Sequence, residues 1–360
     1  MTEFTQHLLD EITLKEENSQ TRFRKRLALA RAITLVESKN ATHRQQADLL
    51  LTSLLANSCN NNSSTFRLGI AGPPGAGKST WIETFGTMLL SGVLKEKQKD
   101  DTNTISFDPS KLAVVCVDPS STVTGGSILG DKTRMLELSR HERAYIRPSS
   151  NGGTFGGLSA YTHDVVSLCQ AASYELVIVE SVGLGQSEVE IAQSVDMLIL
   201  IVPPGGGDEL QGVKKGIMEV ADILIVNKAD GSLLQAARST ASEYRAAVNF
   251  LRPRMEGWST PVLLTSAYTG KGVDKVWQKI LQFRTKMVEM GELQEKRKRQ
   301  SRYWMWKNLQ NLISQQTKND AVLRKTAEAM ERALDGGAIT PRVAAARLLD
   351  SLVGKHDSNV

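Results

Sequence analysis

The chain has 360 residues, of which 41% are hydrophobic and 23% charged, and its formal net charge is +5. This composition excludes a disordered, collagen-like or purely coiled-coil chain, and so small a charge excess does not imply a nucleic-acid partner. The best apolar run, 197–204, is too short to cross a membrane, and the first residues lack the apolar stretch of a secretory signal. Three scattered cysteines, at 59, 116 and 169, favour a reducing compartment.

Residues 1–62 are predicted to form a helical extension. Ala47, Leu50, Leu51, Leu54 and Leu55 recur at the spacing of one helix face. The polar stretch 57–64 that follows is typical of a linker.

Residues 63–285 are predicted to form an α/β core with a mainly parallel sheet. Short apolar runs alternate with helical stretches, and the runs are 66–71, 112–117, 176–179, 197–202, 223–226 and 262–265. Their unbroken hydrophobicity indicates strands that are buried on both faces, with helices as the crossover connections. A lysine-rich insert at 95–110 is predicted to be a surface loop and is assigned no function.

Residues 286–360 are predicted to be helical again. Trp306, Leu309, Leu312 and Ile313 share one helix face, Gly336-Gly337 is typical of a helix end, and Thr340-Pro341 is typical of a helix start. These apolar faces lie outside a complete core, so they need a cover, either the core itself or a second subunit.

The basic run 296–299 is predicted to be a solvated helix face, because glutamates precede it at helical spacing. A partner-binding face is the alternative interpretation of this run.

A phosphate-binding loop follows the first predicted strand of the core. Its residues match the G-x-x-x-x-G-K-[ST] pattern and are Gly72, Pro73, Pro74, Gly75, Ala76, Gly77, Lys78, Ser79 and Thr80. Glycines let backbone N–H groups point at phosphates, and the start of the next helix adds a positive dipole end. We expect Lys78 to contact the β- and γ-phosphates and Ser79 to bind Mg²⁺.

A guanine-reading motif is predicted at 227–230, directly after the run 223–226. Asn227, Lys228 and Asp230 match N-K-x-D, in which the aspartate accepts two hydrogen bonds from guanine that adenine cannot offer. Asn227 is expected to tie this loop to the phosphate loop. Ser266, Ala267 and Tyr268 form a candidate second base-contacting loop, where a backbone N–H would meet guanine O6.

Three acids between these motifs are candidate ligands of Mg²⁺ together with Ser79. Asp118 and Glu180 each follow a predicted strand, and Asp131 lies in a Gly-rich segment. We expect Lys78, Asp118 and Glu180 to be the catalytic groups, although each acid alone could be a helix cap or a surface charge. Gly183 is in the position of a glycine that senses the γ-phosphate. No glutamine follows it directly, since Gln186 comes three residues later, so slow intrinsic hydrolysis that a partner accelerates is a reasonable hypothesis.

Six stretches together resemble the MeaB-like GTPases that associate with methylmalonyl-CoA mutase. They are 72–80, 117–135, 147–149, 180–188, 207–216 and 227–230. The resemblance implies a P-loop NTPase fold of the G3E GTPase type that binds and hydrolyses GTP to GDP and phosphate with Mg²⁺. It also implies a homodimer formed through the helical extensions. The protein would act as a chaperone that gates cofactor loading of the adenosylcobalamin-dependent mutase and protects that enzyme from inactivation.

The same resemblance assigns roles to particular residues. Asp118 and Asp131 match acids of a first switch, Glu180 matches the acid of a second, and 204–215 matches a third that signals to the mutase. The switch and partner-facing residues are then Gly183, Gln186, Asp208, Glu209, Gln211, Lys214 and Lys215. Ser181 stands where the family more often has threonine, and the insert at 95–110 is longer than expected.

Other functions remain open at this point. A P-loop kinase acting on a small molecule would gain nothing from N-K-x-D, and a metal-delivery GTPase would call for a His-rich tract or a cysteine pair, which the sequence lacks. A non-catalytic nucleotide-holding scaffold is disfavoured because the candidate catalytic residues are all present. The expected compartment is the cytoplasm if the protein is bacterial and the mitochondrial matrix if it is eukaryotic.

Overall fold

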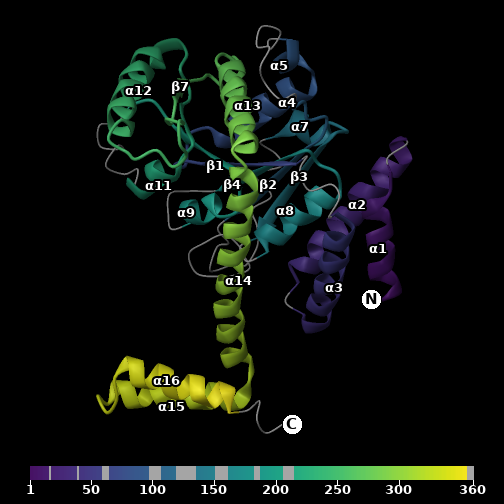
Figure 1. Cartoon of the computed structure of the whole chain (residues 1–360), viewed down its shortest axis with the longest axis vertical. Helices are drawn as coiled ribbons and strands as arrows, with labels where there is room; N and C mark the ends of the chain where they lie inside the picture. The colour runs from purple at the N-terminus through teal and green to yellow at the C-terminus, as the bar shows by residue number, and fades with distance from the viewer. Residues whose placement is uncertain are drawn as a thin grey trace. The chain divides into compact units, whose positions relative to one another are not determined.

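A computed structural model describes residues 1–15, 18–38, 40–58, 65–96, 107–118, 135–150, 161–181, 187–205 and 215–354 (Figure 1). It divides into two compact units, Met1–Arg297 and Lys298–Val360. Within the described ranges, no helix is long and apolar enough to cross a bilayer.

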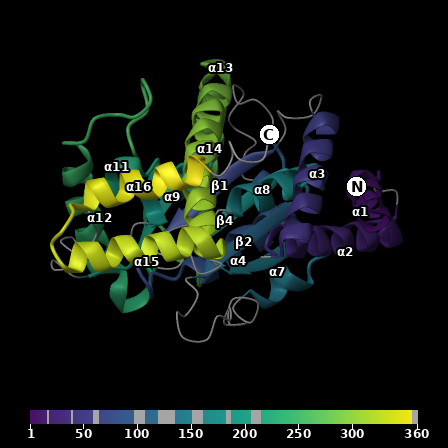
Figure 2. The ribbon, with the colours of Figure 1, turned by 90° about the horizontal axis from the view of Figure 1, so that it is seen from below.

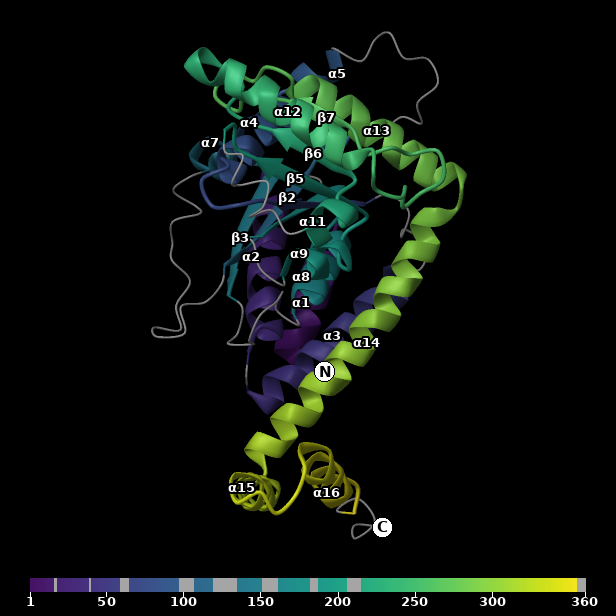
Figure 3. The same cartoon turned by 90° about the vertical axis from the view of Figure 1, so that its left-hand side faces the viewer.

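The first unit is built on a seven-stranded sheet in the order β3-β2-β4-β1-β5-β6-β7, and every neighbouring pair is parallel (Figure 3). The strands are β1 (Phe66–Ala71), β2 (Leu112–Asp118), β3 (Ala144–Ser150), β4 (Leu176–Ser181), β5 (Met197–Val202), β6 (Ile223–Val226) and β7 (Val262–Leu264). This confirms the α/β class and six predicted strands. Asp118 and Glu180 lie within the last residues of β2 and β4 rather than just beyond them.

The seventh strand, β3, was missed because its sequence contains Arg147 and Pro148. Proline cannot donate a hydrogen bond to a ladder, so it occurs in sheets mainly on edge strands. β3 is an edge strand, and Pro148 lies opposite Cys116 of its single neighbour β2. An edge strand can therefore contain Pro148, although a proline in the sequence argues against predicting a strand.

Helices cover both faces of the sheet (Figure 1). On one face α4 (Lys78–Leu90), α7 (Leu136–Arg140) and α13 (Val273–Glu289) share a buried cluster with the strands, in which Phe85 contacts Trp81 and Trp277. On the other face α8 (Thr162–Ala171), α9 (Ser187–Ala192) and α11 (Lys215–Val220) contact the strands. Two short helices, α5 (Val93–Glu96) and η1 (Gly231–Leu233), and α12 (Leu234–Val248), which packs on β6 and β7, complete this layer arrangement.

Three N-terminal helices form a bundle against α8 (Figure 2). They are α1 (Glu3–Thr13), α2 (Ser19–Val36) and α3 (Ala41–Ser58). Of the predicted stripe on α3, Ala47, Leu50 and Leu54 are buried, whereas Leu55 is exposed. The predicted N-terminal helical extension is therefore present, and its apolar face packs on the rest of the unit.

The C-terminal helices are α14 (Glu292–Asn319), α15 (Ala321–Asp335) and α16 (Pro341–Val353), of which α15 and α16 pack together. Thr340 caps α16 by accepting a hydrogen bond from Val343 N, and Gly337 takes a left-handed φ of 66° after α15, as the sequence predicted. Trp306 on α14 is 62% exposed. The apolar face around it, with Met305, Leu309 and Leu312, is exposed in the single chain.

The basic run at the start of α14 corrects the sequence interpretation. Lys298 and Arg299 are exposed, as a solvated face requires, but Arg297 is buried and the Lys296 side chain is only 14% exposed. The physical reason is that two buried acids, Asp196 and Asp222, lie beneath this turn. Periodicity along one helix carries no information on charges that come from elsewhere in the chain.

Candidate nucleotide-binding site

The loop between β1 and α4 has backbone positions that only glycine can occupy. Gly72 has a φ of 151°, and a Cβ there would lie 2.0 Å from the carbonyl oxygen of Ile201. Gly77 has a φ of 84°, and a Cβ there would lie 2.7 Å from Nδ2 of Asn227. At Gly75, in contrast, a Cβ would meet nothing within 4 Å. The loop is thus packed against its neighbours at both ends and open in the middle, as a phosphate cradle requires.

Lys78 begins α4 and turns back over this loop. Its Nζ donates hydrogen bonds to the carbonyl oxygens of Gly72 and Pro73, at 2.9 and 3.1 Å. The side chain is buried, so the ammonium group is held at the loop rather than in solvent. A positive charge at a helix start is well placed to meet a polyanion.

Ser79 and Glu180 meet at the side of the sheet where the strands end, called the carboxyl edge; the side where the strands begin is called the amino edge. Ser79 Oγ donates to Glu180 Oε1 at 2.9 Å, and Cys116 Sγ lies 3.7 Å from Glu180 Oε2. The carboxylate is buried and comes from β4, while the thiol comes from the directly opposite position of β2. Two strands and the phosphate loop therefore fix one acid between them.

Asn227 joins three loops. Its Nδ2 donates to the carbonyl oxygen of Ala76 in the phosphate loop at 3.0 Å. Its Oδ1 accepts from Ala267 N at 3.1 Å and from Thr265 Oγ1 at 3.2 Å. One backbone N–H of the candidate second base-contacting loop, that of Ala267, is thus engaged with Asn227. Since Asn227 is buried and each of these bonds is internal, the phosphate loop and the loops after β6 and β7 form one bonded assembly.

Asp230 lies in the same assembly. Ser266 Oγ donates to its Oδ2 and accepts from Thr269 N, so the carboxylate is oriented by the loop after β7. Lys228 takes a left-handed φ of 57°, a conformation that costs free energy for a side chain with a Cβ and that is common at functional sites. Tyr268 is 91% exposed.

Not every predicted site residue lies in the described part of the chain. Asp131, Gly183, Gln186, Asp208, Glu209, Gln211 and Lys214 lie outside it, and only the backbone is described for Asp118 and Lys215. Conversely, sequence reasoning missed Cys116, Thr265 and Thr84, whose hydroxyl donates to the carbonyl oxygen of Ala267 at 2.7 Å. Thr265 adjoins a predicted site loop, but Thr84 and Cys116 carry no signal in the sequence, because both act across the fold.

The fold and these loops together define a P-loop GTPase. A parallel sheet carries a strand–loop–helix phosphate loop after β1 and an Asn-Lys-x-Asp loop after β6 at the same edge. In open α/β sheets, ligands bind outside the carboxyl ends of the strands. The enzyme is accordingly a GTP hydrolase that binds guanine nucleotides.

Residues 29–321 match the family model described as methylmalonyl Co-A mutase-associated GTPase MeaB, and the chain belongs to this family. It is 42% identical over 337 residues to the mouse protein "Methylmalonic aciduria type A homolog, mitochondrial", which covers 92% of this chain and 77% of that protein. It is also 42% identical to the Escherichia coli protein "GTPase ArgK", over 85% of this chain and 86% of that protein.

A solved structure described as LAO/AO transport system kinase has the same fold. It is 30% identical, with a TM-score of 0.69, and the comparison covers 98% of this chain and 99% of that chain. The predicted family resemblance is thus confirmed over most of the chain.

Proposed function

We propose that this GTPase is a Mg²⁺-dependent chaperone of the adenosylcobalamin-dependent methylmalonyl-CoA mutase. It would use GTP to gate cofactor loading and to protect the mutase from inactivation. The observation that carries the proposal is the match of residues 29–321 to a family described as associated with that mutase. The compartment would be that of the mutase, the cytoplasm in a bacterium or the mitochondrial matrix in a eukaryote.

In this proposal the phosphate loop binds the nucleotide through its backbone N–H groups. The open position at Gly75 supports this role, since a ligand can approach the backbone there. Lys78 leaves its two carbonyl acceptors and contacts the β- and γ-phosphates, where it stabilises the charge that develops as the terminal phosphate departs.

The residues at the carboxyl edge fit a magnesium ion. Mg²⁺ prefers oxygen ligands, and Ser79 and Glu180 already bring a hydroxyl and a carboxylate within 2.9 Å of each other. Ser79, Asp118, Asp131 and Glu180 would hold the ion. When bound, it supplies charge neutralisation at the β- and γ-phosphates. Glu180 would orient the Ser79 hydroxyl by accepting a hydrogen bond from it.

Guanine would be read by Asp230 from the loop after β6. The hydrogen bond from Ser266 supports this role, because it fixes the carboxylate before a base arrives. Lys228 would pack along the base, and the loop of Ser266, Ala267 and Tyr268 would offer a backbone N–H that is not already bonded within the protein for guanine O6.

The partner-facing residues would lie in the segments that follow β4 and β5. β4 and β5 end at Ser181 and Val202, at the edge of the sheet that carries the phosphate loop. A change in the γ-phosphate contacts could therefore reach Gly183, Gln186 and the segment 204–215 directly.

Size-exclusion chromatography with purified methylmalonyl-CoA mutase tests this function. We expect co-elution that differs between GDP and a non-hydrolysable GTP analogue. A missing complex in both nucleotide states would refute the chaperone role while leaving the GTPase assignment intact.

A small-molecule kinase is the competing proposal, because one similar solved structure is described as a transport-system kinase. A kinase needs an acceptor. We expect phosphate release from GTP in the absence of any acceptor, and transfer to an added amino acid such as arginine without free phosphate would favour the kinase.

The exposed apolar face of α14 supports a homodimer through the C-terminal helices. Burying Trp306 and its neighbours in a second copy would remove a large apolar area from water. Light scattering on the full chain tests this. We expect a dimer that Trp306→Glu converts to monomer, whereas Lys318→Glu, at an exposed position on the opposite side of the same helix, should leave it intact.

A further inference from the structure

Two strands of the sheet begin with the same arrangement around an aspartate. Asp196 directly precedes β5; its backbone N donates to Arg67 O, and its Oδ2 accepts from Arg67 N, both at 2.9 Å. Asp222 directly precedes β6 and relates in the same way to Leu198, with both bonds at 2.8 Å. Each carboxylate thus takes the place of a missing backbone acceptor at the amino end of a strand.

The first turns of α14 lie over these two acids. Arg297 donates from Nε and Nη2 to the two carboxylate oxygens of Asp196, at 2.9 and 2.6 Å, and Nη2 also donates to Thr65 O at 2.7 Å. Thr65 directly precedes β1. Arg297 therefore bridges the amino ends of β1 and β5 with a paired, two-pronged contact.

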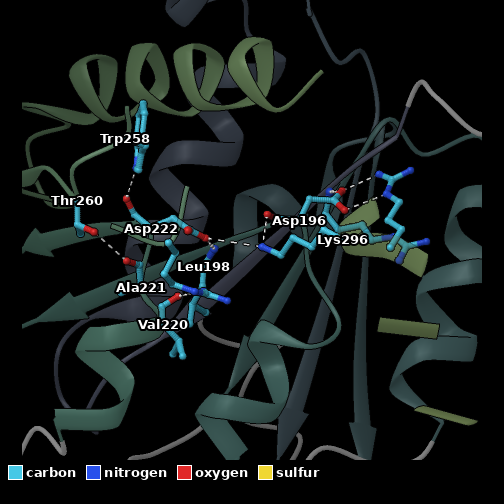
Figure 4. Close-up of polar contacts among 11 residues, drawn as sticks. Asp196, Leu198, Val220, Ala221, Asp222, Trp258, Thr260 and Lys296 are labelled. Atoms are coloured by element: carbon cyan, nitrogen blue, oxygen red, sulfur yellow. Dashed lines mark hydrogen bonds and ion pairs between the residues drawn. The ribbon is translucent and has the colours of Figure 1, made fainter. Parts of the chain in front are cut away.

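Lys296 makes the corresponding bridge between β5 and β6. Its Nζ donates to the backbone oxygen of Asp196 at 2.6 Å and lies 4.0 Å from Asp222 Oδ2 (Figure 4). Trp258 and Thr260 also hold this end of β6, through the backbone oxygens of Asp222 and Ala221, at 3.0 and 3.1 Å.

The Arg297–Asp196 contact is a buried ion pair. Burial alone would raise the pKa of Asp196, but the charge and hydrogen bonds of Arg297, together with Arg67, hold that pKa below its ordinary value. The acid is therefore a carboxylate at neutral pH. A buried pair of this kind fixes geometry strictly, because either partner without the other is a buried, uncompensated charge.

The three strands joined in this way carry the nucleotide site at their other ends. β1 leads into the phosphate loop, β6 leads into Asn227, and β5 lies between them and leads into Pro203–Gly205. In a parallel sheet the strands can differ in their offset along the strand direction, and an offset set at the amino ends is carried to the carboxyl ends. A misplacement of about 1 Å far from the reacting atoms can already lower a catalytic rate strongly.

We propose that Lys296 and Arg297 are positioning residues for GTP hydrolysis, setting the offset between the strands that bear the phosphate loop and the guanine loop. The proposal rests on the roles given above to Lys78 and Asp230. Arg297 sets β1 against β5 and so governs the phosphate end of the site. Lys296 sets β5 against β6 and so governs the base end.

The experiment compares three variants of the full chain: Arg297→Lys, Lys296→Met and, as matched control, Lys298→Met at the exposed neighbouring position. Steady-state hydrolysis of GTP and of ITP is measured for each. The base of ITP lacks the 2-amino group from which Asp230 would accept a hydrogen bond. The ratio of kcat/KM for GTP to that for ITP therefore reports the position of the guanine loop. Thermal unfolding reports the folded fraction.

We expect Lys296→Met to lower the GTP-to-ITP ratio about three- to tenfold with a smaller effect on kcat. Arg297→Lys should instead lower kcat about three- to tenfold and leave the ratio nearly unchanged. Lys298→Met should match the wild type in both. If Arg297→Lys does not fold, Lys296→Met alone decides, since that substitution leaves the buried Arg297–Asp196 ion pair in place.

A second pair of variants tests whether Lys296 acts through Asp222. Asp222→Asn keeps an acceptor for Leu198 N and removes the charge, so it should reproduce the lowered ratio, and the double variant should add little.

The proposal is overturned if folded Lys296→Met keeps the wild-type ratio and kcat, or if both variants lose activity only in proportion to the folded fraction. Kinetics of the wild type distinguish failure of this proposal from failure of the proposed guanine site. A wild type that hydrolyses GTP and ITP equally well would refute guanine reading by Asp230, and Lys296 is then judged on kcat alone.

Discussion

Charged side chains have different kinds of contact at the carboxyl edge and at the amino edge of the sheet. At the carboxyl edge, Lys78 donates to two backbone oxygens of the phosphate loop, and Asp230 accepts a hydrogen bond from the Ser266 hydroxyl. At the amino edge, Asp196 is paired directly with Arg297, and Lys296 approaches Asp222. The first edge is prepared for a charged ligand, whereas the second is complete without one.

Substitutions at the two edges should therefore affect different properties, the reaction at one and stability at the other. Removing a side chain that would contact the ligand should change the free energy of unfolding little but lower the rate of the reaction strongly. Removing one side chain of a buried ion pair should lower the free energy of unfolding, because the other charge remains buried without its partner. Four predictions test this contrast, in descending order of expected effect.

The largest effect is expected at the amino edge. Asp196→Ala should lower the free energy of unfolding by about 3–5 kcal/mol, because it leaves Arg297 buried without its partner. Asp222→Ala, which removes the acceptor for Leu198 N and a more distant cation, should cost about 1–3 kcal/mol. Urea unfolding measures both. Equal losses would contradict the central role of the Arg297 pair.

At the carboxyl edge, Lys78→Ala should lower kcat/KM for GTP about 10²- to 10³-fold by removing a preorganised positive charge. The thermal midpoint should change less than for Asp196→Ala, since Lys78 Nζ donates to loop carbonyl oxygens, whereas Asp196 belongs to a buried ion pair. Steady-state kinetics and thermal unfolding check both parts. A variant that still binds and hydrolyses GTP normally would remove the basis of the site assignment.

A third acid, Asp164, differs from Asp196 because its pKa is raised rather than lowered. Burial, with the nearby charge of Asp48, raises the pKa of Asp164 on α8 to about 7. In the unfolded chain an aspartate titrates near pH ~3.9. The folded form therefore binds the extra proton, and the contribution of Asp164 to stability is lost as pH rises between these two values.

Asp164→Asn should remove this dependence. We expect the variant to gain stability over the wild type as pH rises from 5 to 8, as urea unfolding at the two pH values would measure. A constant difference between variant and wild type would mean that Asp164 does not titrate in this range.

The smallest effect is expected at Cys116, whose thiol lies against Glu180 Oε2. A weak S–H···O contact contributes ~0.5–1 kcal/mol, so Cys116→Ala should lower kcat about two- to fivefold. Cys169→Ala is the matched control, because Cys169 is also a fully buried thiol but lies on α8. Equal effects of the two substitutions on kcat would assign the loss to packing alone.

The sequence predicted the carboxyl edge more completely than the amino edge for a physical reason. Phosphate and guanine recognition depend on short contiguous segments, so 72–80 and 227–230 could be recognised in isolation. The structure then brought both segments together through Asn227 and Ala76. β3 was missed because Pro148 is acceptable only at the edge of a sheet, and no local pattern says where a strand lies in the sheet.

The fold class, the GTPase motifs and the family could all be predicted from the sequence, because each depends on local pattern and spacing. The role of the basic run at 296–299 follows from tertiary packing alone, because Lys298 and Arg299 are exposed, whereas Arg297 is buried against Asp196 and Lys296 is half-buried near Asp222. Those acids are about 75 to 100 residues away in the chain. Charge pairing depends on distance in space, and distance in space is what a linear pattern does not contain.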